Sequence, residues 1–70
     1  MTRAEEMINR LEDEGYVVAN VRYADDTVVN IEMIEDDMTD VVAVEVVTVD
    51  DYEANGYEVE GLETEWMEVK

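Results

Sequence analysis

The sequence predicts an α+β fold in which an N-terminal helix packs on a three- to four-stranded antiparallel β-meander. Three observations lead to this fold class. Apolar residues recur at helical spacing near the N-terminus, they recur at every second position from residue 16 onward, and β-branched valine dominates, with thirteen Val, two Leu and no Phe. The 70 residues, 47% of them hydrophobic, can form one modest core, so we expect a single acidic domain over residues 1–70.

The helix is predicted over residues 2–14. Thr2 and Glu5 have the T-x-x-E spacing of a capping box, in which each side chain bonds to the backbone of the other residue. An apolar stripe at positions i, i+3, i+4 and i+7 follows, made of Ala4, Met7, Ile8 and Leu11. Gly15 is typical of the residue directly after a helix, so the helix should stop there.

Three strands are predicted over residues 16–24, 28–35 and 40–49. Register follows from the faces, because a slip of one residue would turn every side chain to the other side. If the first two strands are joined by a loop with an odd number of residues that pairs Tyr23 with Val29, the apolar residues of both strands lie on one face. A four-residue loop over 36–39 extends the same face through the pairs Met33–Val42, Ile31–Val44 and Val29–Val46. We expect the helix to cover this face, whose members in the first two strands are Val17, Ala19, Val21, Tyr23, Val29, Ile31 and Met33.

The opposite face of the predicted sheet is only partly polar. Arg22, Asn30, Glu32 and Glu45 share it with six apolar residues, namely Val18, Val28, Ile34, Val41, Val47 and Val49. Apolar surface of this extent needs a cover, which either the C-terminal segment or a second copy of the chain could supply. A homodimer therefore stays open.

The last twenty residues allow two interpretations. Residues 50–56 are expected to form a loop with a turn at Asn55-Gly56. A fourth strand over about 57–68, with a β-bulge at Gly61, would put Glu58, Glu60, Glu63 and Glu65 on one side. The alternative is a short C-terminal helix that uses Leu62, Trp66 and Val69.

The charge is the most unusual property of the sequence. Twenty-one Asp and Glu against four Lys and Arg give a net charge of −17 at pH 7. With no basic stripe to displace counterions, direct binding to nucleic acid or to an anionic membrane is not expected. The partner that fits this charge is a basic protein surface, such as that of a nucleic-acid-binding protein.

The residues that are missing argue against catalysis and cofactors. The sequence has no His, Ser or Cys, which are the usual general base, hydroxyl nucleophile and thiolate ligand. The Asp pairs at 25–26 and 36–37 lack the spacing and the glycine of a calcium loop, so we expect no metal site. No segment has the length of a signal peptide's apolar region or of a membrane span, which makes a cytoplasmic location the expectation.

The predicted row of glutamates is the most specific candidate site. Residues on one side of a strand are about 6.6 Å apart, a scale comparable with phosphates that recur about every 3.4 Å along one DNA strand. Such a row could imitate a nucleic-acid backbone and occupy a basic groove. The candidate partner-binding residues, in this row, the 50–56 loop and the 36–39 turn, are Glu58, Glu60, Glu63, Glu65, Asp50, Asp51, Tyr52, Asp36 and Asp37.

Two resemblances imply different roles for the acidity. In size and composition the chain resembles small phage-encoded inhibitors, including some anti-CRISPR proteins, which implies a nucleic-acid mimic that blocks a basic protein. It is also similar to haloarchaeal proteins, which are rich in Asp, Glu, Val and Thr and have almost no Lys; here Lys70 is the single lysine. That likeness implies a small structural or regulatory protein whose charge serves solubility in concentrated salt.

Overall fold

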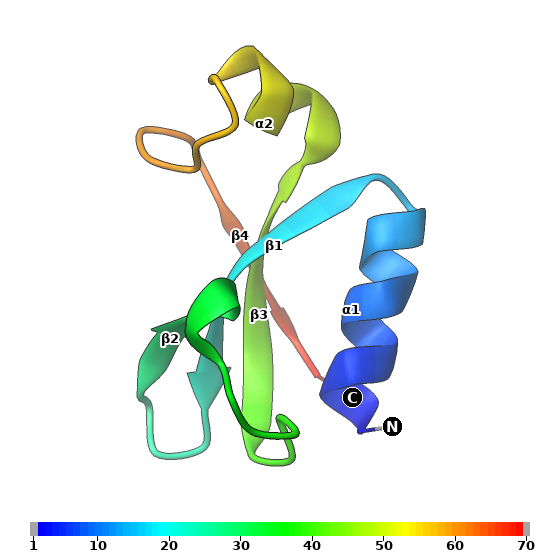
Figure 1. The fold of residues 1–70 in the computed structure, drawn as a ribbon, viewed down its shortest axis with the longest axis vertical. Coiled ribbons are helices and arrows are strands. Elements are labelled where there is room, and N and C mark those ends of the chain that lie inside the picture. The colour runs from blue at the N-terminus through cyan, green and yellow to red at the C-terminus, as the bar shows by residue number, and fades with distance from the viewer. Residues whose placement is uncertain (1, 70) are drawn as a thin grey trace.

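A computed structural model describes residues 2–69 as one helix followed by a four-stranded antiparallel sheet, which confirms the α+β prediction (Figure 1). The elements in chain order are α1 (Arg3–Asp13), β1 (Tyr16–Tyr23), β2 (Val28–Asn30), the 3-10 turn η1 (Ile31–Met33), β3 (Val41–Thr48), α2 (Val49–Ala54) and β4 (Glu65–Glu68). The strands lie in the order β2-β1-β3-β4.

Helix α1 begins with the predicted capping box. The Glu5 amide donates to the Thr2 hydroxyl at 3.3 Å, and the Thr2 amide donates to Glu5 Oε1 at 2.9 Å. Glu14 is the C-cap, and Gly15 follows with φ +97°, a conformation that favours glycine and turns the chain into β1. The helix is thus one residue shorter at each end than predicted.

The β1–β2 hairpin has the expected odd-numbered loop but a different register. The loop consists of residues 24–26, closed by a hydrogen bond from the Tyr23 amide to the Thr27 carbonyl at 2.9 Å. Val21 therefore lies opposite Val29, and the predicted pairing of Tyr23 with Val29 is wrong by two residues. Val21 and Val29 still share a face, because a shift of two residues preserves it.

The second predicted strand ends early. The side chain of Asn30 accepts a hydrogen bond from the Glu32 amide at 2.9 Å, which caps the 3-10 turn η1 and takes the chain out of the sheet after three residues. The pairs expected between residues 29–33 and 42–46 do not form. Instead β3 runs along the other edge of β1, so β1 rather than β2 is central. The four-residue loop is replaced by a longer connection from residue 34 to residue 40.

A β-bulge changes which residues of β1 face the helix. Val18 pairs with Val46 and Asn20 with Glu45, so Ala19 is the extra residue. The bulge reverses the alternation and turns Val18 to the helix side together with Val21. The expectation that Val17 and Ala19 would lie under the helix is therefore wrong. The buried cluster consists of Ala4, Ile8, Leu11, Val18, Val21, Val41, Val44 and Val46.

The C-terminal part differs most from its prediction. Residues 49–54 form the helix α2 rather than a loop, because the Thr48 hydroxyl accepts from the Asp51 amide at 3.2 Å and caps it. Residues 57–64 form turns, and only Glu65–Glu68 pair with β3. Gly61, with φ +86°, lies in a turn and not in a bulge. Neither the strand from residue 57 nor the C-terminal helix is present.

Candidate functional site

Acidic side chains cover the molecule unevenly. Arg3 and Arg10 lie in α1, and Arg22 lies in β1. The 47 residues between Arg22 and Lys70 contain sixteen Asp and Glu and no Lys or Arg. No charged side chain within residues 2–69 is buried. The β1–β2 turn and α2, which lie toward opposite ends of the long axis, contain acidic side chains and no basic ones (Figure 1).

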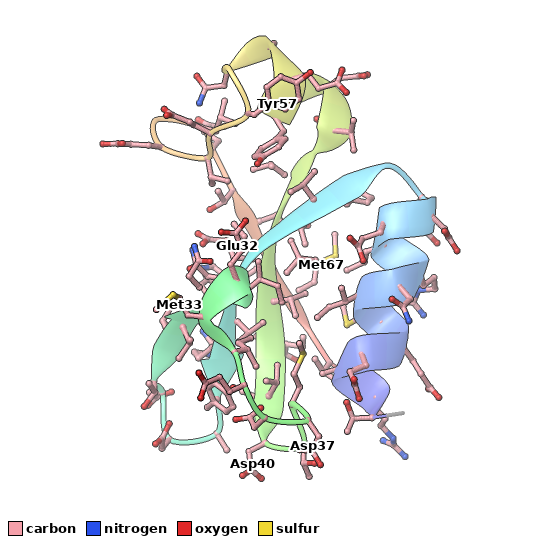
Figure 2. The ribbon with its side chains drawn as sticks, viewed as in Figure 1. Glu32, Met33, Asp37, Asp40, Tyr57 and Met67 are labelled. Carbon is pink, nitrogen blue, oxygen red and sulfur yellow. The ribbon has the colours of Figure 1, made fainter. Side chains whose placement is uncertain are left out.

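A depression lies at the end formed by the β1–β2 turn and residues 33–40, which we name the turn end. It has a volume of about 760 Å³. Asp25, Glu35, Asp36 and Asp40 contribute carboxylates to its lining, and Met33, 73% exposed, contributes an apolar side chain that is open to solvent. Figure 2 shows Asp37 and Asp40 at this end, with Met33 pointing outward from η1. A rim of carboxylates around an exposed apolar side chain suits a basic protein surface.

Tyr23 holds the turn end together. Its hydroxyl donates to both carboxylate oxygens of Asp36, at 3.0 and 3.2 Å, and Asp36 also accepts from the Met38 amide at 2.8 Å. Loss of hydration raises the pKa of the Tyr23 hydroxyl, and the hydrogen bond to Asp36 and the charges of neighbouring carboxylates raise it further. The phenol therefore keeps its proton at neutral pH and stays a donor to Asp36.

Two further carboxylates of this end are fixed by short-range hydrogen bonds. The hydroxyl and the amide of Thr39 donate to Asp37 at 2.6 and 3.1 Å, and both bonds lower the pKa of Asp37. Hydrogen bonds from the hydroxyl and the amide of Thr27 lower the pKa of Asp25 in the same way. Both groups are thus ionised and oriented at neutral pH, as a charged contact surface requires.

Five other predicted site residues lie on α2 and in the loop after it. Asp50, Asp51 and Tyr52 lie on α2, and Glu58 and Glu60 lie in the loop that follows it. These residues form the α2 end of the molecule. The structure brings Tyr52 together with Glu58 and Glu60 around a second depression.

The predicted row of four glutamates on one strand does not form. Glu63 lies in the irregular segment before β4, and only Glu65 belongs to β4, where it pairs with Val46. The row required residues 57–65 to be extended, whereas the turns at Gly56 and Gly61 fold this segment back on itself. Asp36 and Asp37 lie at the opposite end, in the turn end.

A polar cluster on the sheet face away from α1 escaped the sequence analysis. Glu45 accepts hydrogen bonds from the Asn20 amide group and from the Thr64 hydroxyl, each at 2.7 Å. Beside it the Arg22 guanidinium lies over the Trp66 ring, 5.3 Å from its centroid. Trp66 is 39% exposed. The signal was the assignment of Arg22 and Glu45 to the same face, which predicts polar partners there.

The described carboxylates do not assemble a metal centre. Within residues 2–69 no group of three or more Asp or Glu side chains has the proximity to hold an ion. In the same range, none of the helices has the length and apolarity to cross a bilayer.

Comparison of the chain with protein-family models, with curated proteins and with solved structures finds no match.

Proposed function

We propose that this chain is a non-catalytic nucleic-acid mimic that inhibits a basic nucleic-acid-binding protein in the cytoplasm. The observation that carries the proposal is the charge per length. The molecule measures 32 × 23 × 19 Å and has a net charge of −17. A DNA duplex 32 Å long carries about 19 phosphate charges, at one charge per about 1.7 Å of axis. The chain therefore offers a basic groove nearly the charge of the duplex that the groove normally holds.

The positions of the basic residues support the same function. The arginines lie on α1 and near the end of β1, so residues 23–69, which include the β1–β2 turn and α2, contain no basic side chain that would repel a basic surface. Electrostatic attraction between the acidic chain and a basic partner accelerates their association, and the rate constant for association should fall steeply as the salt concentration rises. Such a protein needs no catalytic group and no cofactor.

The test begins with capture of partners from a host lysate by the immobilised chain at ~0.15 M salt, near physiological ionic strength. The captured protein is then purified, and its affinity for its own DNA or RNA is measured with and without the chain. We expect the chain to displace the nucleic acid in a stoichiometric manner. Nucleic-acid binding that is unchanged by saturating chain would contradict inhibition by mimicry.

Charge-reversal variants locate the contact. One variant carries Asp36→Lys and Asp37→Lys, and a second replaces the four glutamates Glu58, Glu60, Glu63 and Glu65 by lysine. The matched control reverses four acids of α1, Glu6, Glu12, Asp13 and Glu14, which changes the net charge as much as the second variant does. The proposal requires a larger loss of affinity from the site variants than from this control.

A halophilic protein is the second candidate, and the acids on α1 favour it. Glu6, Glu12 and Asp13 of the helix and Glu14 at its C-cap are exposed and are not among the candidate contact residues, which is what general surface acidity would produce. Thermal unfolding at ~0.01 M and ~1 M salt separates the two functions, because the screening length falls from about 30 Å to about 3 Å. A mimic must be folded at the lower concentration. Unfolding there would contradict mimicry, whereas a melting temperature that does not respond to salt would contradict halophilic adaptation.

A further inference from the structure

A second depression lies between η1 and the loop that follows α2. Its volume is about 320 Å³, close to the lower limit of the roughly 300–1,000 Å³ typical of ligand pockets. A space of this size suits one long side chain rather than a nucleotide. We name it the tyrosine pocket, after Tyr52 and Tyr57 in its lining.

The two tyrosines supply aromatic surface of defined geometry. Their rings lie edge to face, with centroids 5.9 Å apart and planes at 85°. Tyr57 is 67% exposed, so much of its ring is open to a ligand. An aromatic ring attracts a cation at its electron-rich face, and two rings at right angles offer such faces in two orientations.

Carboxylates complete the walls of the tyrosine pocket. Glu58 and Glu60 come from the same loop as Tyr57, and Glu32 comes from η1 on the opposite side. Figure 2 shows Glu32 rising from η1 toward the end of the molecule that bears Tyr57. Partly buried apolar side chains of Val17, Ile31 and Val59 also contribute to the lining. The pocket thus offers apolar surface for a methylene stem and negative charge for its head.

The loop that carries these groups is held in one conformation. The Asn55 side-chain amide donates to the carbonyls of Glu58 and Glu60, at 2.7 and 2.9 Å. The Tyr57 amide donates to the Tyr52 carbonyl at 2.9 Å. Tyr57 has φ +63°, which is unfavourable for an aromatic residue, and these bonds enforce it. A strained, exposed tyrosine of this kind contributes little to folding and is a recurrent feature of binding sites.

We propose that the tyrosine pocket binds the guanidinium group of an arginine side chain. Arginine fits better than lysine because its planar group stacks on aromatic rings and bonds carboxylates through a fork of donors. The inference rests on the proposed function, because that function supplies the ligand: a basic nucleic-acid-binding protein displays many arginines. It goes beyond that function by assigning a specific anchor to a surface that otherwise acts through total charge.

The test uses acetyl-arginine amide as the probe and acetyl-citrulline amide, its neutral isostere, as the control. Each is titrated into the isotope-labelled chain at ~0.15 M salt, and amide and aromatic resonances are followed by NMR. We expect saturable shifts from arginine that centre on residues 52–60 and Glu32, and none of comparable size from citrulline. Shifts spread evenly over all acidic segments, or centred on the turn end, would overturn the proposal.

Variants separate the aromatic contribution from the charge. Tyr57→Asn removes the ring but suits a positive φ, so the chain should stay folded while affinity for the probe falls about three- to tenfold. Tyr57→Phe keeps the ring and should bind like the parent chain. Equal affinity of the parent and Tyr57→Asn would contradict the proposal.

The contribution of the carboxylates is tested with two variants that have the same net charge as each other. The double variant Glu58→Gln, Glu60→Gln should bind the arginine probe with about two- to tenfold lower affinity than the parent chain. Glu12→Gln combined with Glu14→Gln on α1 should have little effect. Equal effects of the two pairs would show attraction to total charge and would overturn the assignment of a pocket.

Failure of this inference and failure of the proposed function have different signatures. The probe titration needs no partner, so a pocket that binds arginine can be found even if the chain displaces no nucleic acid. Conversely, a partner that is inhibited equally by the parent chain and by Tyr57→Asn would contradict the arginine anchor and leave mimicry intact.

Discussion

The two faces of the central strands β1 and β3 have opposite characters. The face toward α1 is aliphatic, with Val21 and Val44 fully buried against the helix. The other face carries the hydrogen bonds of Glu45 and the stacked pair of Arg22 and Trp66. The helix-covered face therefore contributes most of the free energy of unfolding. The open face orients polar groups and contributes less. Substitutions on the two faces should therefore differ in size.

The largest effect is expected where the aliphatic face is broken. Leu11→Ala removes a side chain that is only 3% exposed and leaves a cavity between α1 and the sheet. Such truncations cost about 2–5 kcal/mol, which is a large fraction of the stability of a 70-residue domain. Urea unfolding at fixed salt measures the loss. Glu12→Ala, on the exposed side of the same helix, is the control, and a loss below about 1 kcal/mol for Leu11→Ala would contradict the comparison.

On the open face the largest effect should come from Glu45. Glu45→Ala leaves the Asn20 and Thr64 donors without their acceptor, and we expect a loss of about 1–2 kcal/mol. The loss is smaller than for Leu11 because the site is half-buried and because one repelling charge disappears. Glu65→Ala makes the same charge change in β4 and serves as the control. If the two variants unfold at the same urea concentration, the hydrogen bonds of Glu45 contribute nothing to stability.

The pair of Arg22 and Trp66 should contribute less. Cation–π pairs at exposed sites are worth about 0.5–1 kcal/mol. A double-mutant cycle with Arg22→Met and Trp66→Leu isolates the coupling from the separate effects of each substitution. We expect a coupling in this range, measured by urea unfolding. A value within error of zero would mean that the ring and the guanidinium are neighbours without mutual stabilisation.

The smallest effect concerns the carboxylates of the turn end and is read as a pKa. Because its folded pKa is below the ordinary value of 3.8, Asp37 stabilises the fold above that pH and loses this contribution as pH falls through the folded pKa. Thr39→Val removes the hydroxyl donor, so the pKa of Asp37 should rise toward the ordinary value in a carboxyl-carbon NMR titration. Thr39→Ser keeps the hydroxyl and should keep the low pKa. An Asp37 pKa that is the same in all three chains would contradict the assigned cause.

The sequence predicted the parts of the fold that local physics determines. The capping box of α1, the glycine after it and the odd-numbered first loop depend on neighbouring residues, and all three are present. The bulge at Ala19 was not predictable from alternation, because it is chosen by the packing of Val18 against the helix. The same applies to β3, whose position beside β1 depends on where η1 directs the chain.

Two failures had a local signal that the sequence analysis did not use. Thr48 and Asp51 have the spacing of a helix N-cap, which indicates α2 despite the valine that follows. Asn30 next to Glu32 indicates a side-chain cap that ends β2. The site was predicted only in part, because Tyr52, Glu58 and Glu60 do meet, but through turns rather than along a strand. Tyr57, which lies in the lining of the same pocket, was not among the predicted site residues.

The short outer strands have a consequence for self-association. β1 and β3 are long and rich in valine, the composition of segments that stack into cross-β fibrils when their edges are free. Here β2 pairs with the outer edge of β1 at residues 20–22, and β4 pairs with the outer edge of β3 at residues 43–46. The outer strands are themselves short, with three residues in β2 and four in β4. Glu65 and Glu68 place charge on the β4 edge, and η1 bends the chain away directly after β2. These features act as gatekeepers that oppose edge-to-edge pairing of a valine-rich sheet.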